Sequence, residues 1–260
     1  MPNPEITVAL PLWRAKDIAW LALESLCRQF TQTPWELIIA EETTQQHNPL
    51  GKGGLAPYRE RLKKAGCVEV TYIPITEWIP LADKWRIIAK MAHPNSRTFI
   101  LQAADCYSEP ARLQRSHDAL KDHHWTHTTK GVFLDLKHNA KALYIHPPRY
   151  PTALNMAVRT QLLRELPTNG PRKGVDRWLF DNATTANGQP LRVEVDPTEG
   201  WKRSLDTHSF NNISIKRGSK IQRVRPPFYP ANGLRIADML PASVVERLKA
   251  LTKAYEHEQA

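Results

Sequence analysis

The chain has 260 residues, 41% of them hydrophobic, and no apolar run approaches the ~20 residues that span a bilayer, so composition excludes a membrane-spanning protein. Its three cysteines are widely separated and form no C-x-x-C motif, which argues against a disulfide framework or a zinc site. The formal net charge of +10 favours a polyanionic partner such as nucleic acid, an anionic membrane surface or a phosphorylated substrate.

Strands and helices alternate through the first half of the chain. The predicted strands cover residues 6–12, 35–40, 68–73 and 97–102, and the predicted helices cover 16–30, 56–65 and 81–92. The polar, glycine-bearing stretch 43–54 is expected to be a loop. Such alternation predicts the α/β class, with a mostly parallel sheet flanked by helices. We therefore expect residues 1–107 to form a nucleotide-binding half.

The second half of the chain is less regular. Its predicted elements are helices over 108–121, 155–166, 175–182 and 241–257, a hairpin of 131–136 with 142–145, and a strand near 191–195. We expect a smaller mixed region over 108–225, so that one domain covers 1–225. A linker and a C-terminal helix follow over 226–260.

Asp105 is the most informative single residue. It follows the apolar run that begins at Thr98 and precedes a turn at Tyr107-Ser108-Glu109-Pro110. Open α/β sheets bind ligands at the carboxyl ends of their strands, and a carboxylate there can hold a divalent cation and, through it, a diphosphate. The alternative is that Asp105 only caps the helix that begins near Pro110.

A basic segment lies near the end of the second half. Residues 215–225 contain five Lys and Arg residues and no acid. This pattern is typical of a contact with a phosphate backbone, and equally of a solvated loop or strand face.

Six segments resemble glycosyltransferase family 2 and its relatives of the GT-A fold. They are Val8-Ala9-Leu10-Pro11-Leu12-Trp13, Leu23-Glu24-Ser25-Leu26-Cys27-Arg28-Gln29, Glu36-Leu37-Ile38-Ile39-Ala40-Glu41-Glu42, Ala103-Ala104-Asp105, the stretch 153–166, and Gly174-Val175-Asp176-Arg177-Trp178-Leu179. Their order and spacing, over roughly residues 5–215, carry the resemblance more than any one of them does. The resemblance implies transfer of a sugar from a nucleotide-sugar donor, most simply a UDP-sugar, to a hydroxyl acceptor.

The same resemblance implies roles for individual residues. Asp176 corresponds to the catalytic base of a single inverting displacement. The residues expected around the nucleotide and its diphosphate are Pro11, Trp13, Glu41, Lys84, Asp105 and Arg203. Ordinary alternatives are a helix N-terminal acid for Asp176, a core side chain for Trp13, a solvated helix lysine for Lys84 and a surface arginine for Arg203.

The expected cofactor is Mn²⁺ or Mg²⁺, held by Asp105 with His208 as an additional ligand. Ala103 occupies the position of the first acid in the family's Asp-x-Asp motif, and a single carboxylate binds a hard cation poorly. A metal-free site, in which Lys or Arg neutralises the diphosphate, is therefore the alternative. His208 could also be a surface or capping histidine.

The acceptor is inferred from charge. A basic chain without a predicted membrane span fits a nucleic-acid acceptor, specifically a hydroxylated base in DNA. The alternatives are a cell-surface glycan or lipid carrier as acceptor, and a non-catalytic nucleic-acid-binding module on a degenerate transferase fold. The first residues show no signal-peptide pattern, so we expect a cytoplasmic protein of a prokaryotic or virus-infected cell.

Overall fold

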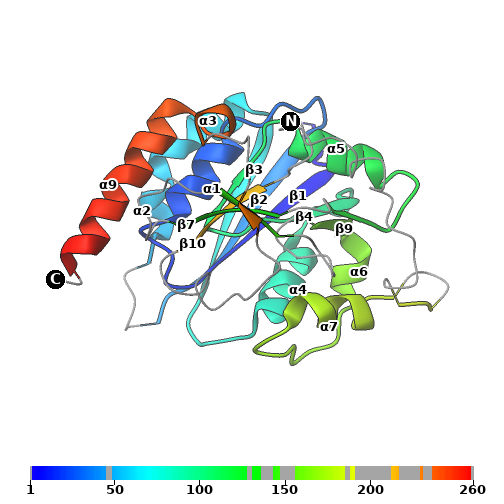
Figure 1. Cartoon of the computed structure of the whole chain (residues 1–260). Coiled ribbons are helices and arrows are strands. Elements are labelled where there is room, and N and C mark those ends of the chain that lie inside the picture. The colour runs from blue at the N-terminus through cyan, green and yellow to red at the C-terminus, as the bar shows by residue number, and fades with distance from the viewer. Residues whose placement is uncertain are drawn as a thin grey trace.

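The computed structural model describes residues 2–44, 49–127, 131–135, 143–146, 156–184, 188–190, 212–216, 229–230 and 236–258. A six-stranded sheet lies at the centre, with strand order β3-β2-β1-β4-β9-β6 (Figure 1). Its strands are β1 (Ile6–Leu12), β2 (Trp35–Glu42), β3 (Cys67–Ile75), β4 (Thr98–Leu101), β6 (Trp125–His127) and β9 (Met156–Arg159). The strands β1 to β4 are parallel to one another, and β9 is antiparallel to both β4 and β6.

Helices cover both faces of this sheet. They are α1 (Ala19–Leu26), α2 (Gly51–Gly54), η1 (Ala56–Tyr58), α3 (Arg59–Lys64), α4 (Leu81–Met91), α5 (Arg112–Ala119), α6 (Thr160–Arg164), α7 (Val175–Asn182), α8 (Ile236–Met239) and α9 (Ala242–Glu258). Apolar residues of α1, α3 and α5 pack with Val8 and Leu10 in one core. Apolar residues of α4, α6 and α7 pack with Ala9 and Ile38 in the other. Successive strand residues therefore enter opposite cores, which explains why the predicted strands are nearly continuous apolar runs.

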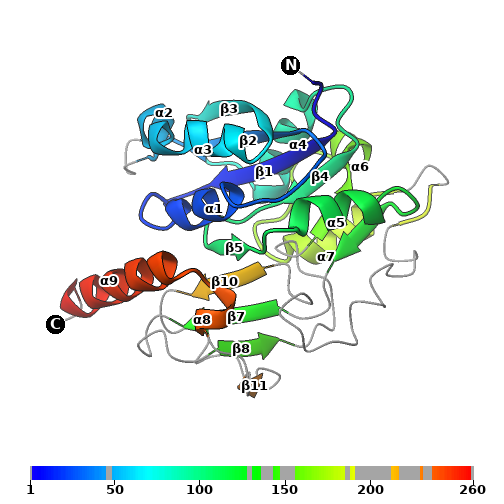
Figure 2. The ribbon, with the colours of Figure 1, turned by 90° about the horizontal axis from the view of Figure 1, so that it is seen from above.

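A second sheet has strand order β11-β8-β7-β10-β5 and lies on the α1 side of the first (Figure 2). Its strands are β5 (Cys106–Ser108), β7 (Gly131–Asp135), β8 (Leu143–His146), β10 (Asn212–Lys216) and β11 (Tyr229–Pro230). Next to this sheet α9 docks on the first core, where Val244 and Leu248 are almost completely buried. The guanidinium of Arg247 lies 4.0 Å from the ring centroid of Trp20.

These observations confirm the predicted α/β class: a mostly parallel central sheet flanked by helices, a smaller mixed region and a C-terminal helix. The predicted hairpin is also present, because β7 and β8 pair antiparallel. The division of the chain into domains stays a prediction. The strand expected near residues 191–195 and most of the basic segment 215–225 lie outside the described residues.

Two local predictions were wrong. The stretch 155–166 was expected to be one helix, but Met156–Arg159 forms β9 and only Thr160–Arg164 is helical. A run of four residues, three of them apolar, fits either structure, and here pairing with the open edge of β4 decides for the strand. The expected loop 43–54 contains the short helix α2, whose glycines gave no helical signal.

A buried polar chain crosses the amino edge of the sheet. The Glu36 carboxylate, 2% exposed, accepts hydrogen bonds from the Thr7 hydroxyl at 2.7 Å and from the backbone N–H of His93 at 2.9 Å. The Ser96 hydroxyl lies 2.6 Å from that of Thr7 and donates to it, because the Thr7 proton points to Glu36. Burial raises the pKa of Glu36, and these hydrogen bonds only partly oppose the effect.

The raised pKa of Glu36 predicts a particular pH dependence. A carboxyl that binds its proton more tightly in the folded than in the unfolded chain stabilises the fold at low pH, and this contribution is lost as pH rises through the raised pKa. Relative to Glu36→Gln, whose amide oxygen can accept the same bonds, the wild type should lose free energy of unfolding as pH rises above 4.5, the ordinary pKa of a glutamate carboxyl. Urea denaturation measures this difference. A constant difference, or one shared by the exposed control Glu60→Gln, would contradict the assignment.

Candidate functional site

The carboxyl ends of the parallel strands form one edge of the central sheet. β1 and β2 end together, since Leu12 is the register partner of Glu41, and β2 ends with Glu42 opposite Ile75 of β3. This is the edge at which open α/β sheets bind ligands. Sequence reasoning placed Pro11, Trp13, Glu41, Lys84 and Asp105 around it.

Lys84 of α4 ties the ends of β1 and β2 together. Its Nζ lies 3.3 Å from Oε2 of Glu42 and 3.4 Å from the carbonyl oxygen of Leu12. The side chains of Lys84 and Glu42 are 5% and 2% exposed. Burial lowers the pKa of Lys84, and the Glu42 carboxylate works against that shift. Lys84 is thus a buried cation at the carboxyl edge, and the solvated-lysine alternative is wrong.

Glu41 points to the opposite side of the strand end from Glu42 and is also buried. Its Oε1 accepts a hydrogen bond from the backbone N–H of Leu50 at 2.7 Å, and its Oε2 accepts from the N–H of Gly51 at 2.9 Å and from the Tyr72 hydroxyl at 2.8 Å. Burial raises the pKa of the Tyr72 hydroxyl most, and the hydrogen bond to the Glu41 carboxylate raises it further. Glu41 therefore fixes the start of α2 against β3, and its contact with a nucleotide stays a prediction.

The turn after β1 exposes an aromatic ring at this edge. The Trp13 side chain is 52% exposed, so the core alternative is wrong. Arg14 follows with a positive φ of 49°, and its guanidinium carbon lies 5.2 Å from the centroid of the Trp13 ring. Pro11 is half-buried inside β1. An exposed ring beside the strand ends is suited to stacking on a planar base.

Asp105 lies in the turn between β4 and β5 and is half-buried. The turn is held from inside by Gln102, whose side-chain amide donates to the carbonyl oxygens of Ala103 at 3.0 Å and Cys106 at 2.9 Å. The Gln102 carbonyl oxygen accepts from the Ser108 hydroxyl at 2.6 Å. The Cys106 thiol donates to Oδ1 of Asp105 at 3.5 Å.

Arg112 supports the same turn from beneath. It is fully buried and donates from Nη1 to Gln102 Oε1 and to Ser108 Oγ, each at 2.8 Å, and from Nη2 to the carbonyl oxygen of Leu101 at 2.7 Å. Burial lowers the pKa of Arg112 to about 10, so the guanidinium stays charged at neutral pH. Sequence reasoning missed Gln102 and Arg112. The available signal was the amide of Gln102 at the end of an otherwise apolar strand.

Asp176 lies in the first turn of α7 and is half-buried. Gly174 precedes the helix with a φ of 70°, a conformation that favours glycine. α7 lies beside α4, and Leu179 and Phe180 share a core with Trp85 and Ile88 (Figure 1).

The segment before α7 packs on the N-terminal end of α4. A Cβ built on Gly170 would come within 2.5 Å of the Ala82 side chain, so only glycine fits this approach. The guanidinium carbon of Arg172 lies 4.4 Å from the ring centroid of Trp78, in the connection between β3 and α4. Because α4 begins just after the carboxyl end of β3, these contacts bring the start of α7, which carries Asp176, close to the end of α4 that lies at this edge.

The metal prediction is only partly covered by the structure. Asp105 is the one expected ligand that is described, since His208, like Arg203, lies outside the described residues. In the described part of the chain no three His, Cys, Asp or Glu side chains are grouped closely enough to hold a metal ion. The described residues therefore do not fit a divalent cation by themselves. Among the described helices, none combines the length and hydropathy that a transmembrane segment needs.

No protein-family model matches the sequence, and no curated protein matches it either. Solved structures do match the fold. S. aureus TarS 1–349 in complex with UDP-GlcNAc aligns with 95% of this chain and 66% of its own at a TM-score of 0.51 and 14% identity. A second structure of S. aureus TarS aligns with 83% of this chain and 35% of its own, at a TM-score of 0.46 and 12% identity. The Pyrobaculum calidifontis mannosyltransferase PcManGT, in complex with GDP-Man and Mn²⁺, aligns with 85% of this chain and 59% of its own, at a TM-score of 0.48 and 13% identity.

At these identities the likeness defines the fold alone, and the match to TarS 1–349 supports the predicted GT-A-like architecture. The chain covers about a third of the TarS chain in that second structure. Activity, substrates and partners do not follow from the comparison by itself.

The buried pair of Lys84 and Glu42 predicts a large stability effect. Lys84→Met leaves the Glu42 carboxylate buried without its counter-charge, and breaking such a pair costs about 3 kcal/mol. The double variant Lys84→Met/Glu42→Gln removes both charges and should recover part of this loss. Free energies of unfolding from urea titrations measure both. Losses that simply add in the double variant would show that the two groups do not interact.

Proposed function

We propose that the chain is a glycosyltransferase that moves a sugar from a nucleotide-sugar donor to a hydroxyl acceptor. The observation that supports this proposal is the carboxyl edge of the sheet, where Lys84 is buried between the ends of β1 and β2 and Trp13 is exposed in the turn after β1. Asp105 in the turn after β4 and Asp176 at the start of α7 are proposed to complete the site. The fold shared with TarS 1–349, a protein crystallised with UDP-GlcNAc, supports a nucleotide-sugar donor, most simply a UDP-sugar.

The donor needs a place for its base and a positive counterpart for its diphosphate. In the proposed arrangement the exposed Trp13 ring and Pro11 contact the base, and Lys84 supplies positive charge behind the strand ends. Glu41 and Arg203 complete the predicted set. A divalent cation, Mn²⁺ or Mg²⁺, held by Asp105 and His208, is also proposed as a ligand of the diphosphate, where it would neutralise negative charge.

In the proposed reaction Asp176 is the general base. The acceptor oxygen attacks the anomeric carbon of the sugar, its proton passes to the Asp176 carboxylate, and the bond from that carbon to the diphosphate oxygen breaks with its electron pair leaving on the nucleoside diphosphate. A single displacement of this kind inverts the anomeric centre. The first turn of α7 suits the role, because it holds Asp176 on a helix anchored to α4.

The proposed acceptor is a hydroxylated base in DNA. Its support is the net charge of +10, which attracts a phosphate backbone. A cell-surface glycan or lipid carrier is the alternative acceptor. The alternative in which the chain is not an enzyme is a non-catalytic nucleic-acid-binding module on this fold. Transfer of labelled sugar to hydroxymethylated DNA separates these acceptors.

Substitution of the two acids tests the enzyme proposal without knowledge of the acceptor. Release of nucleoside diphosphate from a panel of UDP- and GDP-sugars, with water or DNA as acceptor, should fall at least about 100-fold in Asp176→Asn with little change in KM. Asp105→Asn should raise KM for the donor as well as lower turnover.

Asp181→Asn is the matched control. Asp181 lies on the same helix as Asp176, and its carboxylate forms an exposed ion pair with Arg177 at 3.7 Å, which has no proposed role in catalysis. It should keep wild-type turnover, and all three variants should unfold at similar urea concentrations. Wild-type protein that turns over no donor, or an Asp176→Asn variant as active as Asp181→Asn, would overturn the proposal.

A further inference from the structure

A hollow of about 700 Å³ lies at the opposite, amino edge of the six-stranded sheet. It lies where β1 and β4 begin, against α5 and α6. The side chains that matter for its chemistry are Glu5, Arg97, His117, Lys121, Arg159 and Arg164.

This hollow is separate from the carboxyl edge. β1 crosses the sheet from one edge to the other over seven residues, which at about 3.3 Å per residue separates the two edges by about 20 Å. A group bound here would therefore not contact Lys84 or the strand ends beside it.

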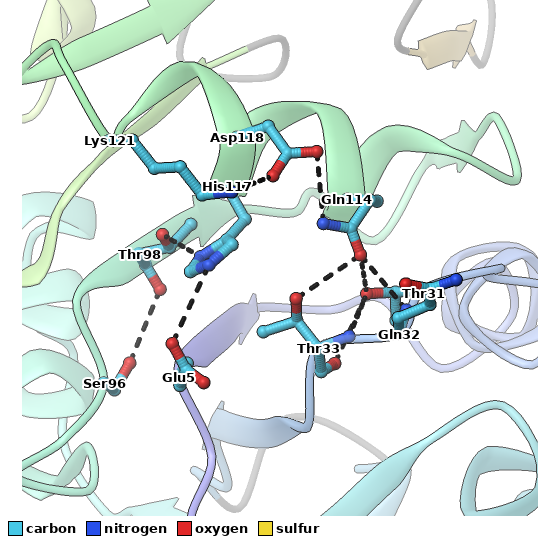
Figure 3. Close-up of polar contacts among 10 residues, drawn as sticks. All are labelled: Glu5, Thr31, Gln32, Thr33, Ser96, Thr98, Gln114, His117, Asp118 and Lys121. Atoms are coloured by element: carbon cyan, nitrogen blue, oxygen red, sulfur yellow. Dashed lines mark hydrogen bonds and ion pairs between the residues drawn. The ribbon is translucent and has the colours of Figure 1, made fainter.

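The lining is strongly positive. Arg97, Lys121, Arg159 and Arg164 are permanent cations, and Glu5 is the one carboxylate among the described lining residues. Figure 3 shows the His117 ring between Thr98 and Glu5, with Nδ1 at 2.9 Å from the Thr98 hydroxyl and Nε2 at 3.8 Å from Glu5 Oε2. Burial lowers the pKa of His117, so this ring adds no positive charge at neutral pH.

The two arginines on the far wall are held in place by neutral groups. Arg159 donates from Nε and Nη2 to the backbone carbonyl oxygens of His123 and Lys121, at 2.9 and 3.1 Å. Arg164 donates to three carbonyl oxygens at and just after the C-terminal end of α4, at 3.0 to 3.2 Å. A carbonyl oxygen orients a guanidinium without cancelling its charge. Both side chains therefore keep their charge and further N–H donors for a ligand.

The other two cations lie at the rim and are exposed. Lys121 pairs with Asp118 at 2.7 Å, as Figure 3 shows, and an exposed pair of this kind is weak and leaves other N–H groups of the ammonium for a ligand. No hydrogen bond of the Arg97 side chain is found within the described residues. Fixed cations at the wall and adaptable cations at the rim together match an anion that carries several oxygens and more than one negative charge.

We propose that this amino-edge hollow binds a phosphate-bearing anion, independently of the donor site proposed above. Phosphate matches the lining better than a carboxylate does, because it offers more acceptor oxygens and more charge to four cations. A hollow of about 700 Å³ also has room for more than one phosphate group. The phosphate can belong to a small free molecule or to a phosphodiester chain, and the two sources can be distinguished experimentally.

Isothermal titration calorimetry on the full chain, with inorganic pyrophosphate and with a thymidine oligonucleotide of about eight units at low salt, tests the proposal. Arg97→Gln/Lys121→Gln should weaken binding about tenfold, and Glu5→Gln should tighten it about threefold, because the first loses two cations and the second one carboxylate. Lys63→Gln/Lys64→Gln on α3 is the matched control, since it changes the net charge by the same amount on an exposed surface.

Two outcomes support the proposal and identify the source. Pyrophosphate binding that is sensitive to Arg97 and Lys121 shows a site for a free phosphate compound, and tighter, equally sensitive binding of the oligonucleotide shows a site for a chain. Binding of neither probe, or equal weakening by the rim variant and the α3 control, would overturn the proposal. Pyrophosphate at the donor edge should not respond to these substitutions, so the result is independent of the proposed transferase activity.

Discussion

The buried contact of Lys84 with Glu42 and the Leu12 carbonyl is the constraint on which the functional edge depends. It joins three segments that are distant in sequence, namely the ends of β1 and β2 and the second turn of α4. A buried ammonium is tolerated only with a counter-charge and hydrogen-bond acceptors, and here the two strand ends provide both. The same contact places a positive charge beneath the surface where a diphosphate is proposed to bind.

The other candidate residues are held at this edge by different means. The turn of Asp105 is braced by Gln102 and the fully buried Arg112, so its conformation depends on hydrogen bonds rather than on packing. Asp176 depends on packing, because α7 shares a core with α4 and Gly170 allows the preceding segment to approach Ala82 closely. A site assembled from a rigid sheet and a helix anchored to it is expected to need little rearrangement when a ligand binds.

Much of the architecture could be predicted because its strands are buried on both faces. Ile6–Leu12 and the middle of β2, residues 37–40, are almost uniformly apolar and are separated by helical periodicity, which is typical of a parallel sheet. β9 could not be predicted from four residues whose pattern suits a strand or a helix, since the free edge of β4 decides between them. The second sheet depends on pairing between distant strands, such as β5 with β10, which no local pattern encodes.

The roles predicted for the site residues stay predictions, but the surroundings of Lys84 and Glu41 can be compared with what their sequence context indicated. Lys84 lies four residues before Ile88, on the same helical face, and this spacing indicates that the lysine is buried. The positive charge of its side chain suggests the opposite, a solvated position. The hydrogen bonds of Glu41 to Leu50 and Gly51 depend on how the chain returns after β2, which the sequence does not show. The positive hollow at the amino edge joins residues from β4, β9, α5 and α6 and from the connections that precede β1 and β4 and follow α5, and its charge appears only after folding.

A crystal structure of the protein soaked with UDP and Mn²⁺ tests the central claim most directly. We expect the nucleotide at the carboxyl ends of β1 and β2, with its base near Trp13 and its diphosphate on the side of Lys84 and Asp105. A nucleotide bound at the amino edge, or a carboxyl edge that stays empty at saturating UDP, would contradict it.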